Sequence, residues 1–148
     1  ITLNATIAPV LTVDLTMNAY ENILEAFTVR NQYPVEVDLI AGRGRNYSGN
    51  VKMNTTWHFP GKIDFQLLYI YLAPDVIPQG RIGSRYSIDA GVKKMIQHGR
   101  GELSVNATDL FGTMRIRKTI FNEDFVWAST DYYETQIIRA GYSYKFGK

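Results

Sequence analysis

The sequence of 148 residues has no cysteine, a net charge of only +2 and no long uninterrupted apolar run. The missing cysteine excludes disulfide bonds and thiolate metal sites. The small charge, with Lys and Arg scattered along the chain, argues against nucleic acid as a partner. A membrane-spanning helix needs about 20 consecutive apolar residues, so no helix of this sequence is expected to cross a bilayer.

Other signals of function are also missing. His58 and His98 have no acidic or second histidine partner at ligand spacing, so no metal site and no cofactor are predicted. No histidine stands near a Ser and an Asp in sequence, and we therefore predict no enzyme. No Met, basic segment or apolar signal core precedes Ile1, which indicates a mature or truncated product.

Alternation of apolar and polar residues with a period of two is what the sequence does contain. In the last such stretch, Ile138–Phe146, the apolar and aromatic side chains all share one face, which is typical of a β-strand with one apolar side. Seven stretches follow this pattern, with no helical segment between them: 1–7, 11–19, 47–59, 63–71, 86–93, 102–108 and 138–146. The sequence therefore predicts an all-β fold, an antiparallel meander of about seven strands.

The connections between these stretches alternate in length. Short turns are expected near Pro9, Pro60 and Gly99, whereas residues 21–46, 73–85 and 110–132 form long connections. Short turns at one rim and long loops at the other are typical of a transmembrane β-barrel of the bacterial outer membrane, with the short turns periplasmic. The runs have roughly the 9 to 11 residues that a tilted strand needs to cross the hydrocarbon layer.

Aromatic residues separate this interpretation from a soluble sandwich, because interfacial Trp and Tyr gather at the ends of membrane strands. One set of aromatic residues falls at the short-turn end and a second at the long-loop end: Trp57, Phe59, Tyr144 and Phe146 in the first, and Tyr20, Tyr47, Tyr69, Tyr71 and Tyr86 in the second. Between the two sets the apolar faces carry no charge. A charge at mid-depth on a lipid face would cost about 2 to 4 kcal/mol, so its absence favours the membrane.

The opposite faces are polar and include charged residues such as Asp14, Lys52, Asp89 and Arg139. In a barrel they would fill or line the interior, or contact a plug. Each of them is as readily explained as the solvated side of a sheet, and none is assigned a ligand.

Seven strands do not make a closed barrel of this kind, since single-chain bacterial barrels use an even number and seven is odd. Two strand edges would also be left unpaired in lipid. We therefore expect residues 1–148 to be the C-terminal segment of a larger barrel, with the remainder N-terminal to Ile1 or in another chain. Residues 35–41 are an alternative eighth strand, although the acidic Glu36 and Asp38 suit an extracellular hairpin better.

Three stretches carry a family resemblance: Tyr86–Lys94, Gly101–Gly112 and Arg139–Phe146. They resemble the last three strands of TonB-dependent receptor barrels of the Bacteroidetes outer-membrane type, including an Asn-x-x-Asp-Leu-Phe stretch that ends the penultimate strand. Less than half of the chain carries this specific likeness. No plug domain, TonB box or signal sequence is present in it.

The resemblance implies an outer-membrane receptor or transporter for a bulky nutrient, coupled to TonB through a plug. It implies as partners the lipid bilayer with its lipopolysaccharide, the rest of the barrel and the barrel-assembly machinery, and leaves open a surface lipoprotein. The final strand, with Tyr142, Tyr144 and Phe146, resembles the family's assembly signal; the same aromatic residues, with Trp57 and Phe59, also fit an interfacial girdle. Ligand contacts are expected from loop residues: Tyr33, Arg43, Arg45, Tyr47, Arg81, Arg85, Trp127, Tyr132 and Tyr133.

Two alternatives remain from the sequence. One is a complete eight-stranded outer-membrane barrel with a structural or adhesive role, in which residues 35–41 cross the membrane and the chain folds alone. The other is a soluble lipocalin-like binding protein whose apolar faces turn inward and which needs no detergent.

Overall fold

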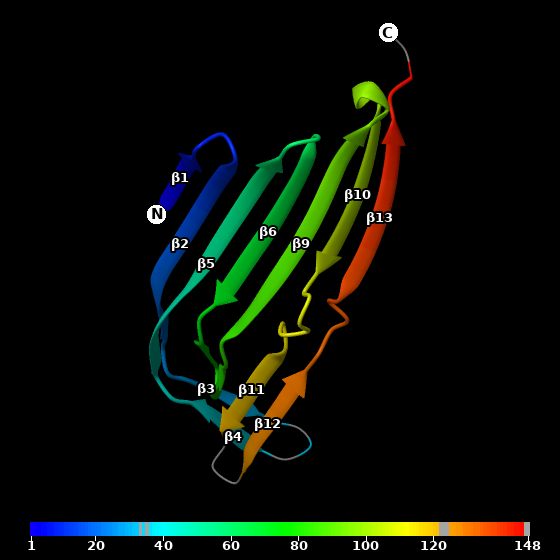
Figure 1. Cartoon of the computed structure of the whole chain (residues 1–148). Coiled ribbons are helices and arrows are strands. Elements are labelled where there is room, and N and C mark those ends of the chain that lie inside the picture. Colours follow the sequence, from blue (N-terminus) through cyan, green and yellow to red (C-terminus); the bar gives the residue numbers. More distant parts are fainter. Residues whose placement is uncertain (33, 35, 122–124, 147–148) are drawn as a thin grey trace.

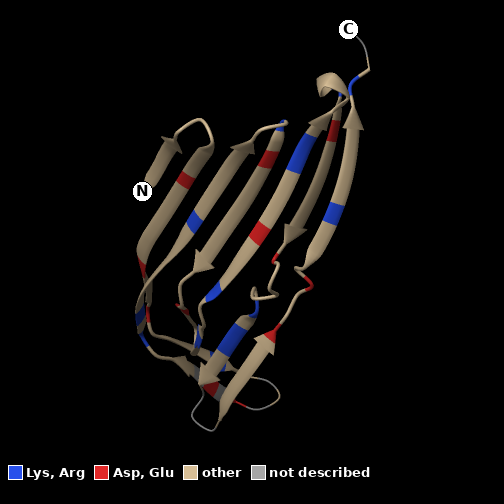
Figure 2. Ribbon diagram, in the orientation of Figure 1, with Lys and Arg blue, Asp and Glu red and all other residues tan. Residues whose placement is uncertain are grey.

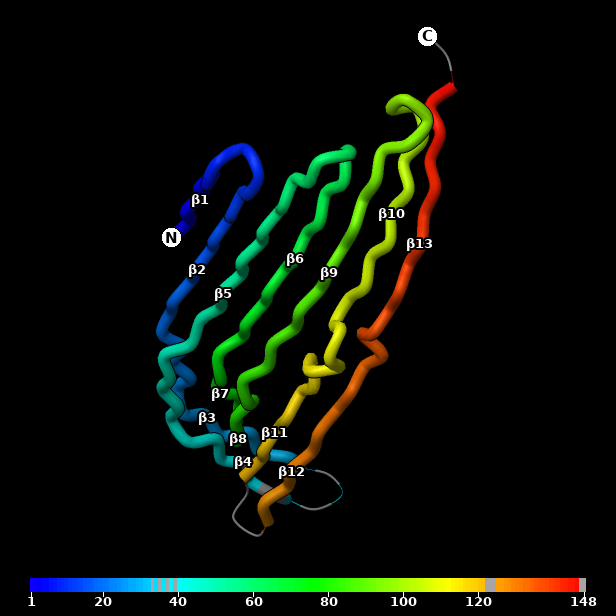
Figure 3. The backbone as a smooth tube through the Cα atoms, viewed as in Figure 1, coloured from blue at the N-terminus to red at the C-terminus, as the bar shows by residue number. Residues whose placement is uncertain are grey.

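The computed structural model describes residues 1–32, 34, 36–121 and 125–146. Seven antiparallel strands lie side by side in one open sheet with the order β1-β2-β5-β6-β9-β10-β13 (Figures 1 and 3). The strands are β1 (Thr2–Ile7), β2 (Leu11–Leu24), β5 (Gly44–Phe59), β6 (Ile63–Leu72), β9 (Arg85–Ile96), β10 (Gly101–Thr108) and β13 (Ile137–Tyr144). The seven strands predicted from alternation are therefore confirmed. No described helix is both long and apolar enough to cross a membrane.

The short connections all lie at one rim, at the top of Figure 1. Residues 8–10 and 60–62 form turns, and η1 (Gln97–Gly99) is a single 3₁₀ turn. Left-handed backbone allows these tight reversals: Gly61 has φ of 85° and Gly99 has φ of 89°, which glycine adopts without a steric penalty. The predicted short turns are confirmed.

The long connections contain strands that the sequence pattern did not predict. A four-stranded sheet, in the order β12-β11-β8-β7, is built from two of them. Its strands are β7 (Asp75–Ile77), β8 (Gly80–Ile82), β11 (Ile116–Phe121) and β12 (Val126–Asp131). Interpreting residues 73–85 and 110–132 simply as loops was therefore wrong. The strands of this second sheet are short, and β7 and β8 have three residues each, too few for a period of two to stand out.

The third connection folds into a hairpin of its own. Strand β3 (Phe27–Asn31) pairs with β4 (Val37–Ala41), and β4 is no member of the seven-stranded sheet. The preferred prediction for this segment, a hairpin extension, is confirmed for the described part, and the eighth membrane strand is not found there. Residues 33 and 35 lie outside the described residues.

Strands β2 and β5 continue five and three residues past their predicted ends, to Leu24 and back to Gly44. Their pairing is unbroken from Leu11 opposite Trp57 to Leu24 opposite Gly44. The apolar alternation stops earlier because Glu21 and Arg45 occupy the face that is apolar further down. Backbone pairing does not depend on the solvent that the side chains meet, so the sheet extends beyond its apolar band.

The sheet has almost no core of its own. Among the described residues Ala41 is the only buried apolar residue, while large apolar side chains along the sheet are open to the surroundings, with Leu3 at 58% exposure, Val105 at 51% and Ile138 at 78%. A soluble sandwich buries one face of each sheet against another layer. This sheet leaves its apolar face uncovered, as a wall in contact with lipid does.

Candidate functional site

Register fixes which side chains share each face of the wall. One row of the apolar face crosses the middle of the sheet. In it, each residue lies opposite the next on the neighbouring strand: Val13, Thr55, Leu67, Ala90 and Ala107. The neighbouring row of the opposite face runs Thr12, Thr56, Gln66, Gly91, Asn106 and Arg139. The two faces predicted from the sequence are thus continuous over all of these strands.

The aromatic residues predicted to form a girdle lie near the short-turn rim. Trp57 and Phe65 are cross-strand partners near the short-turn rim, with ring centroids 5.3 Å apart. Tyr144 and Phe146 meet edge to face at 4.7 Å, and Phe59 lies in the last pair before the turn at residues 60–62. Tyr142, one strand position earlier on the same face, donates its hydroxyl to Gln97 at 3.0 Å.

The second belt gathers at the other end of the apolar face. Tyr69 and Tyr86 have ring centroids 6.3 Å apart, and Tyr71 pairs directly with Tyr86. Tyr20 does not belong to this belt. It lies on the polar face together with Asn18 and Asn22, and its hydroxyl donates to Asp75.

The polar face carries a hydrogen-bonded network between strands. Gln66 donates to Asn54 at 2.7 Å, and Asn54 donates to Asp14 at 3.4 Å. His58 and Asp64 are joined through Nδ1 and Oδ1 at 2.7 Å. The sequence interpretation of His58 as a residue without an acidic partner was wrong, because the partner stands on the next strand, six positions on. Among the described residues no group of three His, Cys, Asp or Glu side chains is placed to hold a metal ion.

The polar face also has an apolar strip that strict alternation did not predict. In β6 the residues of polar-face parity change from Asp64 and Gln66 to Leu68, Ile70 and Leu72 toward the long-loop rim. Their neighbours on that face include Asn54 and Lys52. A packed element inside a barrel would have apolar side chains to contact here.

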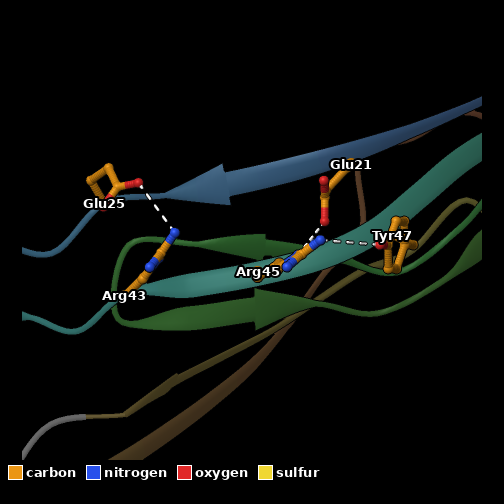
Figure 4. A network of polar contacts seen from close by, with 5 residues as sticks. All are labelled: Glu21, Glu25, Arg43, Arg45 and Tyr47. Carbon is orange, nitrogen blue, oxygen red and sulfur yellow. Dashed lines mark hydrogen bonds and ion pairs between the residues drawn. The ribbon is translucent and has the colours of Figure 1, made fainter.

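The long-loop rim holds those predicted ligand-contact residues that the structure describes, and they fall into two groups. On one side, Arg45 is ion-paired with Glu21 and donates to the hydroxyl of Tyr47 at 3.2 Å, while Arg43 lies 3.7 Å from Glu25 (Figure 4). Tyr47 is 73% exposed and has the guanidinium of Arg45 5.8 Å from its ring centroid. These arginines are neutralised by nearby carboxylates.

The other group lies on the second sheet and the start of β9. Arg81 stacks on Phe121 at 5.7 Å, and Arg115 stacks on Tyr132 at 5.6 Å. Arg85 lines a pocket together with Arg115 and Arg117, two residues that the sequence analysis missed. Trp127, in β12, and Tyr133 are exposed, at 49% and 62%. Tyr33 lies outside the described residues.

The Asn-x-x-Asp-Leu-Phe stretch has a clear structural role at this rim. Asp109, just beyond the end of β10, is only 2% exposed. Its carboxylate accepts hydrogen bonds from the backbone N–H groups of Thr113 (2.9 Å) and Met114 (3.2 Å) and from the Thr135 hydroxyl, while its own N–H donates to Asp89 at 2.8 Å. The Asp109 side chain thus joins the turn after β10 to the segment before β13, and its backbone N–H joins the same turn to β9.

Two carboxyl groups outside the wall have lowered pKa values. Burial alone would raise the pKa of Asp109, but the hydrogen bonds from Thr135, Thr113 and Met114 outweigh burial and hold it below the ordinary 3.8. In β7, burial opposes hydrogen bonds from Asn22, Val76 and Tyr20, and the pKa of Asp75 is likewise lowered. Both carboxylates are therefore charged structural acceptors that hold the rim together.

An open antiparallel wall with an apolar girdled face and a polar network on the other face belongs to a membrane-spanning β-barrel. Over residues 1–144 the sequence matches the model of the outer membrane protein beta-barrel family, and the chain belongs to that family. It is thus a protein of the bacterial outer membrane, which removes the soluble lipocalin-like alternative. No curated protein and no solved structure is similar enough to match.

Proposed function

We propose that this chain is the C-terminal wall segment of a TonB-dependent receptor that takes up a bulky nutrient, without a catalytic step in the segment itself. The observation that carries the proposal is the open wall. β1 runs toward the short-turn rim, since the turn at residues 8–10 follows it, and β13 also runs toward that rim, since Tyr144 pairs with Gly101. Two edges that point the same way cannot close on each other in an antiparallel barrel.

Closure then needs further strands, an odd number of them, from elsewhere in the protein. Wider barrels enclose a water-filled or plugged lumen. The strip of half-buried Leu68, Ile70 and Leu72 on an otherwise polar face supports a plug, because contact with a packed element would remove these apolar side chains from the water of the channel. The likeness of residues 86–94, 101–112 and 139–146 to the last receptor strands supports the same proposal.

The C-terminal strand has a second proposed role. Tyr142 and Phe146 are exposed at 55% and 89%, and with Tyr144 they form an aromatic stripe on the apolar side of the edge strand. We propose that this stripe is read by the barrel-assembly machinery before it becomes part of the interfacial girdle.

The test starts from the native membrane. An antibody against residues 1–148 is used to isolate the polypeptide from outer membranes, and its intact mass is measured together with capture of TonB after cross-linking in cells. We expect a species several times larger than the 16.8 kDa of this segment that captures TonB. A heat-resistant species of about 16.8 kDa without TonB would contradict the proposal and support the small barrel.

A further inference from the structure

A basic pocket lies at the long-loop rim where the wall meets the second sheet. It encloses about 380 Å³ between the first residues of β9, the first residues of β11 and the turn that follows β10. Figure 2 shows blue segments on β9 and β11 in this region. The pocket is lined by Arg85, Arg115 and Arg117, by the aromatic Tyr86 and Phe111, and by the backbone around Gly112.

The arginines of this pocket differ from the arginines on the β2–β5 side in their charge partners, and resemble Arg81, which packs over Phe121 and has no ion pair in the described part of the chain either. Among the described residues, Arg85, Arg115 and Arg117 form no ion pair, whereas three arginines on the β2–β5 side are each paired with a carboxylate: Arg30 with Asp38, Arg43 with Glu25 and Arg45 with Glu21. Lys118, next to Arg117 but on the other side of β11, is paired with Asp131. Three arginines without an ion pair to any described residue thus line one pocket.

Nearby carboxylates are already engaged. Asp109 accepts its hydrogen bonds from Thr113, Met114 and Thr135, and Asp89 accepts one from the Asp109 backbone. These acceptors hold the floor of the pocket in place, because Thr113 is one of the lining residues. Asp89 and Asp109 therefore hold the turn after β10 in place, and neither forms an ion pair with an arginine of the pocket.

The arginines are also held in position before any ligand arrives. Arg115 donates through Nε to the carbonyl of Gly112 at 3.1 Å and packs over Tyr132, which fixes its guanidinium. Arg85 is half-buried at the start of β9, on the polar face with Ser87. Holding binding groups in place in advance lowers the entropic cost of binding.

We propose that this pocket binds an anionic group of the phosphoryl or carboxylate class. Guanidinium groups bind such anions through two parallel hydrogen bonds. Three arginines line this pocket, and none of them is ion-paired with a carboxylate that the structure describes. Two sources can supply the anion: a soluble ligand entering from outside, or the phosphate of a surrounding outer-leaflet lipid. The soluble source rests on the proposed receptor function, whereas anion binding itself does not.

The experiment uses the full-length polypeptide that contains this segment, placed in nanodiscs of phosphatidylethanolamine with or without diphosphorylated lipid A. Binding of inorganic pyrophosphate is measured by calorimetry. We expect the double variant Arg85→Gln/Arg117→Gln to bind pyrophosphate at least about tenfold more weakly, because two of the three charged donors that line the pocket are lost. Arg117→Lys, which keeps the charge but loses the planar fork, is expected to weaken binding less.

Arg30→Gln is the matched control, because it removes the same charge from an arginine paired in the β3–β4 hairpin; its affinity should equal that of the wild type. Heat-dependent migration on gels verifies that each variant is folded. Pyrophosphate binding that lipid A blocks assigns the lipid phosphate as the source, and binding that lipid A leaves unchanged assigns a soluble anion.

Absence of pyrophosphate binding, with no lipid A retained through these arginines, would overturn the proposal, as would equal affinity in the folded double variant. TonB capture is measured separately on the same preparation. Anion binding without TonB capture would support the anion-binding pocket and contradict the proposed receptor function. TonB capture without anion binding would support the receptor function and contradict the pocket.

Discussion

At the scale of single residues, Asp109 is important for the long-loop rim because its carboxylate accepts four hydrogen bonds there. Its carboxylate is buried and accepts bonds from two backbone N–H groups and two hydroxyls. Removing it leaves buried donors without an acceptor. The sequence marked this residue through its motif, but only the structure shows what the motif does.

Asp109→Ala is expected to lower the stability of the folded barrel by about 1 to 3 kcal/mol, the cost of leaving buried donors unsatisfied. The measurement is equilibrium unfolding in urea of the full-length protein in lipid vesicles. Asp75→Ala, at a carboxylate with fewer backbone donors, is the comparison, and an equal loss for both would contradict a special role for Asp109.

The lowered pKa of Asp109 also predicts a pH dependence. A carboxyl whose folded pKa lies below its unfolded value of about 3.8 contributes stability that is fully present above that value and is lost as pH falls through the folded pKa. Asp109→Asn should therefore flatten the loss of stability below about pH 4. Unchanged acid sensitivity in the variant would show that other groups control it.

At the scale of elements, the two faces of one strand should respond in opposite ways to charge. Leu67, at the centre of β6, is on the apolar face, and its neighbour Gln66 is on the polar face. Leu67→Arg is expected to destabilise the barrel by about 2 to 4 kcal/mol, as charges at mid-membrane do. Gln66→Arg should cost far less, measured by the same unfolding experiment; equal costs would mean that the apolar face does not meet lipid.

The β3–β4 hairpin should be dispensable for folding. Replacing residues 27–41 by a short Gly-Ser linker is expected to change stability by less than about 1 kcal/mol, because β3 and β4 pair with each other and Leu24 already lies opposite Gly44. Heat-dependent gel migration checks whether the shortened protein still folds. A protein that no longer assembles would contradict this prediction.

The sequence predicted the wall well and the rim poorly, for a physical reason. Inside the membrane every second residue must be apolar, so strands such as Ile137–Tyr144 can be recognised from alternation alone. Outside the membrane, both faces of a strand meet water, so strand pairing there leaves no alternation of apolar and polar residues in the sequence. Arg115 and Arg117 were missed as site residues for this reason: only the pairing of β11 with β8 brings them beside Arg85.

At the scale of the whole molecule, the parallel direction of the two edge strands is decisive. This segment lacks cysteine, so introduced pairs can report on closure. Leu3→Cys combined in turn with Cys at Ile138, Ala140 or Tyr142 is expected to form no disulfide in the native protein, because other strands separate β1 from β13. Val105→Cys/Ala140→Cys, a directly opposed pair, is the positive control. An oxidised β1–β13 pair would mean that the seven strands close by themselves.

The hairpin's independence has a consequence for how the protein changes over generations. Residues in the wall are constrained by lipid on one side and by cross-strand partners on both edges, so most substitutions there are selected against. β3 and β4 pair with each other, so a substitution in one strand can be compensated by a substitution at the opposite position of the other. A hairpin that lies outside the seven-stranded sheet is therefore expected to tolerate changes of sequence that the wall does not.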